Sequence, residues 1–587
     1  MKDLAGQLSD AAGAAFAGLG LDPALGAMRR SDRPDLADFQ CNGAMAAAKA
    51  AKRNPREIAQ GVVDALSGHP LVASAEIAGP GFINIRISTA GLAAMAEAIA
   101  ADKRAGAISA DQPRRVVMDF GGWNVAKEMH IGHLRSTIIG DSLQRLFRFM
   151  GDDVTSDVHL GDWGLQMGQL INEVKLEQPG LPYFDAAFKG PYPKESPVSI
   201  EDLERLYPQA SAKSKADETR RNEDRQATAE LQSGRPGYRA LWRHFCETTR
   251  VSLERECAAL GVTFDLWKGE SDAQPLIPEL IDDLKSRKIA ELDDGAWIVR
   301  VARNSDKKEM PPFLLVNRDG AAGYHATDLG TILDRKRTID PQLSLYIVDQ
   351  RQALHFEQVF RAADKAGYMA EATLEHLGFG TMNGKDGKPF KTRAGGVLKL
   401  QDLISQADTA AEARLTEAGL GADLPADERT ATAHKVAIAA IKFADLSNVR
   451  TTNYVFDLDR FISFEGKTGP YLLYAAVRMK SLARRAADEG VTPGAIAIEL
   501  DAERGLVLAL DGFGDAMRGA YDKRLPHILC DHAYSLAQAF SAFYAAAPIL
   551  AEKDPVKRAS RFALTLATLK QLERALSLIG IETPDRM

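Results

Sequence analysis

The sequence predicts an α/β protein, in which a Rossmann-like parallel sheet is preceded by an α+β module and followed by an all-α bundle. Between residues 113 and 425, short apolar runs typical of strands alternate with stretches of helical periodicity. Residues 1–112 combine alanine-rich helical stretches with one alternating strand, and residues 426–587 show almost only helical periodicity. Strands that alternate with helices favour a parallel sheet, whose ligands bind at the carboxyl ends of its strands.

Length and composition are those of an ordinary globular protein with several domains. The 587 residues are too many for one hydrophobic core, and 45% of them are hydrophobic and 26% charged. The net charge of −7 neither requires nor excludes a nucleic-acid partner, because such binding depends on local patches. No run of about 18 apolar residues occurs, so we expect no membrane span.

The cysteines indicate a reducing compartment. The chain has four, widely spaced and without a C-x-x-C pair: Cys41, Cys246, Cys257 and Cys530. This spacing argues against a disulfide framework and against a zinc ribbon, so we expect a cytoplasmic protein without a structural metal. The apolar stretch 11–21 favours an early amphipathic helix over a secretory signal, because Asp3 and Asp10 are acidic where a signal would be basic.

The first module contains a clear strand. Phe82, Ile83, Asn84 and Ile85 alternate in polarity after a Gly-Pro-Gly turn, which predicts a half-buried strand. Alanine-rich stretches such as "CNGAMAAAKAAK" precede it and predict helices.

The middle of the chain repeats a strand-then-loop pattern. "RRVVMDF" (114–120) predicts a strand, and a Gly-Gly loop then leads to a helix that begins near Gly132. Residues 176–265 form a charged, helical insertion. The remaining predicted strands are "VTSDVHL" (154–160), "GAWIVRV" (295–301), "PPFLLVNRDG" (311–320), "AAGYHATD" (321–328) and "LSLYIVDQ" (343–350). Residues 426–587 form a separate helical bundle.

A nucleotide site of the usual glycine-rich kind is absent from the sequence. "GKDGKPF" (384–390) lacks the Lys-Ser/Thr of a P-loop, and the 121–132 loop does not make G-x-G-x-x-G. His130 and His133 offer an alternative, because N–H donors at a helix N-terminus favour phosphate. Gly132 would let a flat base or sugar lie against the backbone. A helix start whose histidines are satisfied locally is the other interpretation.

A second basic element follows later. Residues 384–396 form a Gly- and Lys-rich loop, in which Lys388, Lys391 and Arg393 could follow charge that develops on a leaving polyphosphate. The alternative is a solvated basic turn.

These motifs resemble the two signatures of the class I aminoacyl-tRNA synthetases, with "HIGH" at 130–133 and "KPFKT" at 388–392 in place of "KMSKS". Their surroundings are similar to the arginyl-tRNA synthetases along the whole chain. The stretches that carry this resemblance are "NVAKEMHIGHLRSTIIGD" (124–141), "HLGDWGLQMG" (159–168), "YHATDLG" (324–330), "IVDQRQALHF" (347–356), "DFQCNGAMAAAK" (38–49), "GPGFINI" (79–85) and "LSLIGIETPDRM" (576–587).

The resemblance implies that arginine is activated with ATP, supplied with Mg²⁺, and then transferred to the 3′-terminal ribose of tRNA(Arg). His130 and His133 would stabilise the α- and β-phosphates, and Lys391 would hold the pyrophosphate with Lys388 and Lys127 assisting. Gly132 and His355 would complete the ATP site. The family expectation is a monomer.

The resemblance also implies an arginine pocket. A guanidinium requires carboxylates and planar acceptors around it. The family's pocket falls here on Asn124, His159, Glu270, Tyr324, Asp328 and Gln352. By itself, "YHATD" favours an ordinary strand end with a helix-capping aspartate, and only the family resemblance indicates a pocket.

The outer domains resemble tRNA-binding parts of the family. Phe82 and Asn84 match positions that meet an unstacked base at the tRNA elbow, with core filling as the alternative for Phe82. The bundle resembles the anticodon-binding domain, in which residues 447–457 and Arg478 are candidate contacts and helix packing is the alternative. Tyr471 and Tyr474 are further candidates of the same kind.

Two other functions remain as alternatives. The first is a tRNA-binding paralogue without catalysis, which has no need of the intact His130, Gly132, His133, Lys388 and Lys391. The second is a class I synthetase for another amino acid, which the acceptors for a guanidinium disfavour. Two departures from the family pattern are the bulky Trp123 and the Pro389-Phe390 pair in the second signature.

Overall fold

A computed structural model describes residues 2–318, 320–369, 371–388 and 398–587. Its contacts divide the chain into two compact units. One unit comprises Met1–Ser109, Ala411–Phe443 and Phe461–Met587, and the other comprises Ala110–Ala410 and Ala444–Arg460. Two of the boundaries fall within the helices α14 (Leu400–Glu417) and α15 (Ala426–Leu446).

The second unit is built on the predicted parallel sheet, which the structure confirms. The sheet has the order β11-β10-β5-β6, and each neighbouring pair is parallel. Its strands are β5 (Arg115–Phe120), β6 (Asp153–Asp157), β10 (Leu343–Ile347) and β11 (Thr373–His376). All five residues of β10 are buried, as expected for a strand covered on both faces.

The helix α5 (Ile131–Met150) connects β5 to β6 and lies close against the sheet. A Cβ atom at Gly140 would lie 2.2 Å from Cγ of Phe120, so the close approach of helix and strand requires a glycine there. The predicted start near Gly132 is confirmed. The helix therefore presents its N-terminus at the carboxyl end of β5.

The strands around residues 291–316 differ from the prediction. β7 (Glu291–Asp293), β8 (Ala296–Val299) and β9 (Phe313–Val316) form a separate antiparallel sheet. The predicted strand 321–328 is wrong, because the helix α12 (Tyr324–Thr338) begins within it. An apolar run indicates burial but not strand direction, which depends on partners elsewhere in the chain.

Other elements complete this unit. The helices α11 (Ile277–Ser286) and α13 (Ala353–Ala366) share an apolar core with the antiparallel sheet, and α10 (Glu270–Ala273), η2 (Gln274–Leu276) and η3 (Gln350–Gln352) are short helices of the same unit. The short parallel pair β12 (Met382–Asn383) and β13 (Tyr454–Val455) belongs here too. The segment 447–457, which the sequence analysis assigned to the bundle, therefore groups with this second unit. The helix α16 (Leu458–Phe461) follows it.

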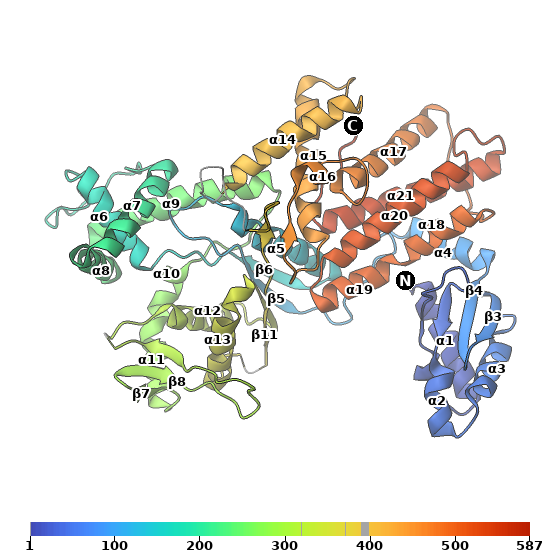
Figure 1. The fold of residues 1–587 in the computed structure, drawn as a ribbon, viewed down its shortest axis with the longest axis horizontal. Helices are drawn as coiled ribbons and strands as arrows, with labels where there is room; N and C mark the ends of the chain where they lie inside the picture. The colour runs from blue at the N-terminus through green and yellow to red at the C-terminus, as the bar shows by residue number, and fades with distance from the viewer. Residues whose placement is uncertain (1, 319, 370, 389–397) are drawn as a thin grey trace. The chain divides into compact units, whose positions relative to one another are not determined.

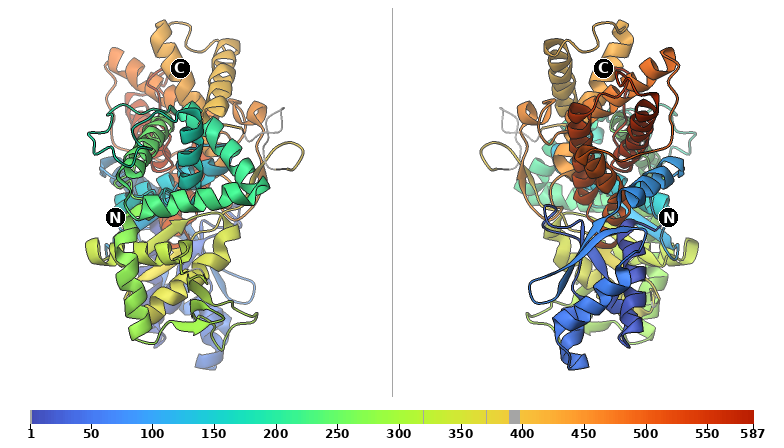
Figure 2. Two further views of the ribbon diagram at one scale, coloured as in Figure 1. Left: turned by 90° about the vertical axis from the view of Figure 1, so that its left-hand side faces the viewer. Right: turned by 90° about the vertical axis from the view of Figure 1, so that its right-hand side faces the viewer.

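The predicted insertion is helical. It contains α7 (Ile200–Ala216), α8 (Glu218–Gln232) and α9 (Pro236–Ala259), which pack with α6 (Leu165–Glu177) and share an apolar core of their own. These helices are teal to green in Figures 1 and 2.

The first unit contains the N-terminal α+β module, blue in Figure 1. Its antiparallel sheet has the order β1-β2-β4-β3, with β1 (Met28–Arg30), β2 (Phe39–Cys41), β3 (Val72–Ala78) and β4 (Phe82–Ile87). The helices are α1 (Leu4–Gly18), η1 (Pro23–Gly26), α2 (Gly43–Ala51), α3 (Pro55–Leu66) and α4 (Thr89–Ala101). The predicted alternation in β4 is confirmed, since Ile83 and Ile85 are fully buried while Phe82 and Asn84 are half-buried.

The same unit contains the C-terminal bundle, orange to red in Figure 1. It consists of α17 (Gly469–Asp488), α18 (Asp501–Asp511), α19 (Phe513–Lys523), α20 (His527–Ala546) and α21 (Pro555–Leu578). Within the described residues of both units, no helix is long and apolar enough to cross a membrane.

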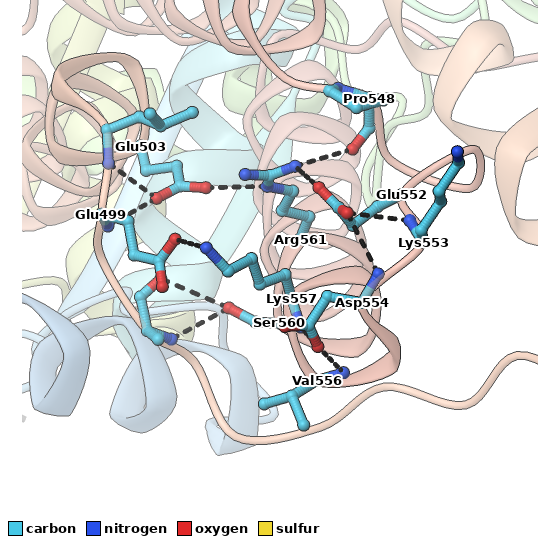
Figure 3. Close-up of polar contacts among 12 residues, drawn as sticks. Glu499, Glu503, Pro548, Glu552, Lys553, Asp554, Val556, Lys557, Ser560 and Arg561 are labelled. Atoms are coloured by element: carbon cyan, nitrogen blue, oxygen red, sulfur yellow. Dashed lines mark hydrogen bonds and ion pairs between the residues drawn. The ribbon is translucent and has the colours of Figure 1, made fainter.

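A buried ionic network holds α21 in the bundle (Figure 3). The Arg561 guanidinium donates to the carboxylates of Glu503 at 3.0 Å and Glu552 at 2.6 Å, and to the Pro548 carbonyl at 3.1 Å. The side chains of Arg561 and Glu503 are only 7% and 3% exposed. One turn away, Lys557 pairs with Glu499 at 2.6 Å, but these side chains are 42% and 45% exposed.

The two ion pairs provide a matched test of burial. Replacing Arg561 by alanine should lower the free energy of unfolding by about 3 kcal/mol, because the Glu503 carboxylate would remain buried without its cation. The matched variant Lys557→Ala should change it by less than about 1 kcal/mol. Denaturant unfolding followed by circular dichroism measures both. Equal losses in the two variants would contradict this account.

Candidate active site

The histidine pair lies at the start of α5. Its two rings are stacked, with centroids 3.7 Å apart and planes inclined by 22°. Nδ1 of His130 accepts from the Gly132 N–H at 3.0 Å, and Nδ1 of His133 accepts from the His130 N–H at 3.4 Å. A neutral ring whose Nδ1 accepts carries its proton on Nε2. The local helix start thus fixes both rings and leaves two Nε2–H donors.

The surroundings keep both histidines neutral. Burial lowers the pKa of His133 to about 3, with help from His130 and Lys127, and burial followed by Lys127 lowers the pKa of His130. Burial also lowers the pKa of Lys127, whose ammonium lies 4.7 Å from the ring centre of Tyr207. The site therefore combines two neutral donors with one cation at the positive end of a helix dipole.

The lack of a side chain at Gly132 is required by the protein's own packing. A Cβ atom there would lie 2.7 Å from Cε1 of His130, so the glycine makes room for the protein's own imidazole. Its outer side is exposed, and the predicted contact with a ligand stays a prediction.

The first signature is paired with the residues that follow the second. The Ile131 N–H donates to the Leu398 carbonyl at 3.1 Å, and the Leu400 N–H donates to the Met129 carbonyl at 2.9 Å. Lys388 is exposed, and its N–H donates to Asp386. Lys391 lies outside the described residues.

Asp328 lies between two histidines. One carboxylate oxygen is 3.2 Å from Nε2 of His159, and the other is 2.5 Å from Nε2 of His355. Although burial alone would raise it, the hydrogen bonds from these histidines hold the pKa of Asp328 well below its usual value. Burial opposes the shift of His159 too, but the bond to Asp328 and the nearby Asp119 raise the pKa of His159 to about 9.

Asn124, His159 and Glu270 are brought together by backbone pairing. Asn124 forms a parallel bridge with Gly161, and Leu160 forms one with the residue before Glu270. A Cβ atom at Gly161 would lie 2.3 Å from Oδ1 of Asn124, so this glycine makes room for the amide. Burial raises the pKa of Glu270 to about 7; His159 opposes this shift and Asp328 adds to it.

The other two predicted pocket residues border this group. Tyr324 begins α12 one turn before Asp328, and its side chain lies outside the described residues. Gln352 ends η3, is exposed, and precedes His355 on the next turn. Among the residues that the structure describes, no group of three or more His, Cys, Asp or Glu side chains is placed to hold a metal ion.

Sequence analysis missed a buried charged residue beneath this site. Nη2 of Arg335 donates to Asp119 at 2.7 Å and to Asp157 at 2.8 Å. The two aspartates lie near the ends of "RRVVMDF" and "VTSDVHL", so a polar residue ending an apolar run was the available signal. Arg335, their partner, lies far away in the sequence, and no sequence pattern indicated its role.

Of the predicted tRNA contacts, Phe82, Asn84 and Arg478 lie on the other unit, whereas residues 447–457 belong to the unit with the histidine pair. Oδ1 of Asn84 accepts from Gln40 on the neighbouring strand at 2.9 Å, and Phe82 is half-buried on the same side of β4. Arg478 lies over the rings of Tyr474 and Tyr544, at 4.8 Å and 5.2 Å. Helix packing therefore already uses much of the Arg478 side chain, and its contact with tRNA stays a prediction.

Three family models match the chain in order. The N-terminal domain of arginyl-tRNA synthetase matches residues 2–87, and the catalytic domain described as "tRNA synthetases class I (R)" matches residues 95–458. The "DALR anticodon binding domain" matches residues 472–587. Together with the parallel sheet and the histidine-capped helix, these matches define a class I aminoacyl-tRNA synthetase.

Relatives that match along the full length of the chain identify the family within this class. The arginine–tRNA ligase of Hyphomonas neptunium is 62% identical and that of Maricaulis maris 60% identical, each with 100% of both chains covered. The chain belongs to the arginyl-tRNA synthetases. It is thus an enzyme, an arginine–tRNA ligase with arginine, ATP and tRNA as substrates, and no comparison supports the non-catalytic alternative.

Solved structures agree on the fold. The arginyl-tRNA synthetase of Thermus thermophilus superposes with a TM-score of 0.79 at 22% identity, with 100% of both chains covered. The enzyme of Plasmodium falciparum superposes with a TM-score of 0.77 at 23% identity, covering 95% of this chain and 94% of that one.

The His159–Asp328 pair predicts an unusual titration. His159 should titrate near pH 9, and in Asp328→Asn its pKa should fall, because burial is then opposed by Asp119 without the bond to Asp328. Since the pKa is raised in the folded state, this pair's contribution to stability is complete below pH 6.5 and is lost as the pH rises through about 9.

Histidine-selective ¹⁵N NMR over a pH series measures this titration. His532, which lies in the other unit and whose pKa burial lowers to about 4, is the internal control and should not respond to Asp328→Asn. A wild-type His159 that titrates near 6.5 would contradict the assignment.

Proposed function

We propose that the residues around α5 and α12 carry out arginine activation and its transfer to tRNA(Arg) at the carboxyl edge of the parallel sheet. A carboxylate oxygen of arginine attacks the α-phosphorus of ATP, and the bond to the β-phosphate breaks as pyrophosphate leaves. A terminal ribose hydroxyl of the tRNA then attacks the carbonyl carbon, and AMP leaves. The observation that carries the proposal is the pair of half-buried carboxylates, Asp328 and Glu270, on the unit that bears the histidine pair.

His130 and His133 stabilise the phosphates through their Nε2–H groups. Neutral donors fixed before the reaction stabilise developing charge without reorganisation. Lys127 adds a cation, and Lys388 and Lys391 follow the pyrophosphate, with the role of Lys391 resting on the resemblance alone. Gly132 and His355 complete the nucleotide site, and ATP arrives as its Mg²⁺ complex.

Asp328 and Glu270 recognise the guanidinium of arginine. In the free site, His159 and His355 contact the carboxylate of Asp328. The guanidinium of arginine replaces these histidines as the hydrogen-bond donor to that carboxylate. Glu270 loses its proton when a cation approaches. Asn124 and Gln352 supply planar amide acceptors, and the role of Tyr324 rests on the resemblance alone.

The outer domains bind the tRNA. Residues 1–112 contact the elbow through Phe82 and Asn84, residues 426–587 contact the anticodon arm with Arg478 among the contacts, and residues 113–425 form the catalytic domain. The enzyme acts as a monomer in the cytoplasm.

Arginine-dependent ATP–pyrophosphate exchange, with and without tRNA(Arg), tests the activity. We expect exchange with arginine and none with lysine. Replacing His133 by alanine should lower kcat for exchange by about 100-fold, because one donor to the developing charge is lost. A wild-type chain that binds tRNA but supports no exchange in any condition would favour the non-catalytic paralogue.

The pKa of Glu270 predicts a pH dependence of arginine binding. Because burial raises that pKa to about 7, protonation below this pH removes an acceptor for the guanidinium. The Kd for arginine should therefore rise by about tenfold per pH unit on the acid side.

Calorimetric titration over a pH series measures this Kd. Glu270→Gln should bind more weakly and lose the acid-side dependence, whereas the exposed Glu279→Gln on α11 should keep the wild-type profile. The same acid-side slope in Glu270→Gln would assign the titration to another group.

A further inference from the structure

The segment before His130 is held by side chains of the helical insertion. The Ala126 N–H donates to Oγ1 of Thr249 at 3.0 Å, and the Met129 N–H donates to Oε2 of Glu256 at 2.9 Å. Thr249 and Glu256 lie on α9 and are 0% and 1% exposed. The insertion therefore supplies acceptors that the loop cannot supply for itself, and these fix the backbone that leads into α5.

Glu204 on α7 is the third side chain of the insertion that accepts from a backbone N–H of this segment, and it also contacts a lysine outside the segment. Its Oε1 accepts from the Glu128 N–H at 3.1 Å, and its Oε2 accepts from Nζ of Lys399 at 2.5 Å. Lys399 also donates to the Glu128 carboxylate at 2.6 Å. One carboxylate thus contacts the first signature segment through one oxygen and the residues after the second signature through the other.

Backbone pairing also joins the two segments that Glu204 contacts. Lys399 forms an antiparallel bridge with His130, flanked by the pairing of residues 398 and 400 with Ile131 and Met129. One helical turn beyond Glu204, Tyr207 lies against the ammonium of Lys127. The face of α7 that bears Glu204 and Tyr207 therefore contacts the segment before His130, including Lys127, and also contacts Lys399 in the segment paired with it.

The same face borders a hollow beside the histidine. This hollow has a volume of about 640 Å³, and its lining includes Lys127, His130, Glu204, Tyr207 and Lys399. The Glu204 side chain is 23% exposed, so its two bonds are partly shielded from water without being sealed in the core. Its position can therefore respond to changes in α7.

We propose that Glu204 is a positioning residue for arginine activation, which aligns the His130 loop with the segment that follows the second signature. This inference rests on the proposed function, because it assigns Glu204 a role through the phosphate-binding histidines. Glu204 is placed to act through backbone and lysine contacts rather than on the substrates. Losing it shifts the loop, and a shift of about 1 Å in positioned groups is enough to lower rates about 100-fold.

Steady-state ATP–pyrophosphate exchange of Glu204 variants tests the proposal. We expect Glu204→Ala to lower kcat at least about tenfold while the KM for arginine changes less than about threefold, because the pocket around Asp328 is untouched. Glu204→Gln should retain part of the rate, since its amide oxygen still accepts from the Glu128 N–H. The exposed Glu223→Gln on α8 is the matched control and should behave as wild type.

A double-variant cycle with Lys399→Met separates positioning from general damage. If Glu204 acts through Lys399, the double variant should lose little more rate than the worse single variant, because contacting residues are not additive. Melting temperatures verify that each variant is folded. Unchanged kcat in a folded Glu204→Ala, or losses that simply multiply in the double variant, would overturn the proposal.

Failure of the proposed function has a different outcome. A wild-type chain without exchange activity refutes the proposed function, and the role of Glu204 with it. Wild-type exchange that falls in His133→Ala but not in folded Glu204→Ala refutes only the positioning role.

Discussion

Asp119 and Asp157 lie opposite each other on adjacent parallel strands, and the buried Arg335 is the cation that makes this arrangement possible. Like charges opposite each other destabilise a sheet. Arg335 is 2% exposed and donates to both carboxylates. Burying all three groups is costly unless they are paired, so this contact fixes α12 to the carboxyl edge of β5 and β6. The position of the proposed arginine pocket follows from that attachment.

Arg335 and Asp328 lie two turns apart on α12, on the same side of the helix. His159 follows Asp157 by two residues, beyond the end of β6. Asp328 is thus joined through α12 to Arg335, and His159 is joined through two residues to Asp157, which Arg335 contacts. His159 has a positive φ of 51°, an uncommon conformation for a residue with a side chain, and the bond to Asp328 stabilises it there.

Local patterns in the sequence were enough to predict β4, β5, β6, β10 and the start of α5, because each depends on periodicity or on a helix start. The resemblance to a family predicted Asn124, His159, Glu270 and Asp328 as residues of one pocket. Neither could predict the antiparallel direction of β8 and β9, since that depends on pairing rather than on the apolar runs. Nor could they predict the roles of Arg335 and Glu204, whose partners lie more than seventy residues away in the chain. Long-range polar contacts leave no periodic trace in a sequence.

The pairing of Asp328 also bears on substrate choice. Its two carboxylate oxygens are met by N–H groups of two different histidines, at 3.2 Å and 2.5 Å. A guanidinium offers several N–H groups in one planar fork, so arginine reproduces this two-donor arrangement with a single group. The ammonium of lysine is a compact point charge and cannot reproduce the planar fork. In the proposed arginine pocket, the histidines therefore hold Asp328 in a two-donor geometry that a guanidinium reproduces and the ammonium of lysine does not.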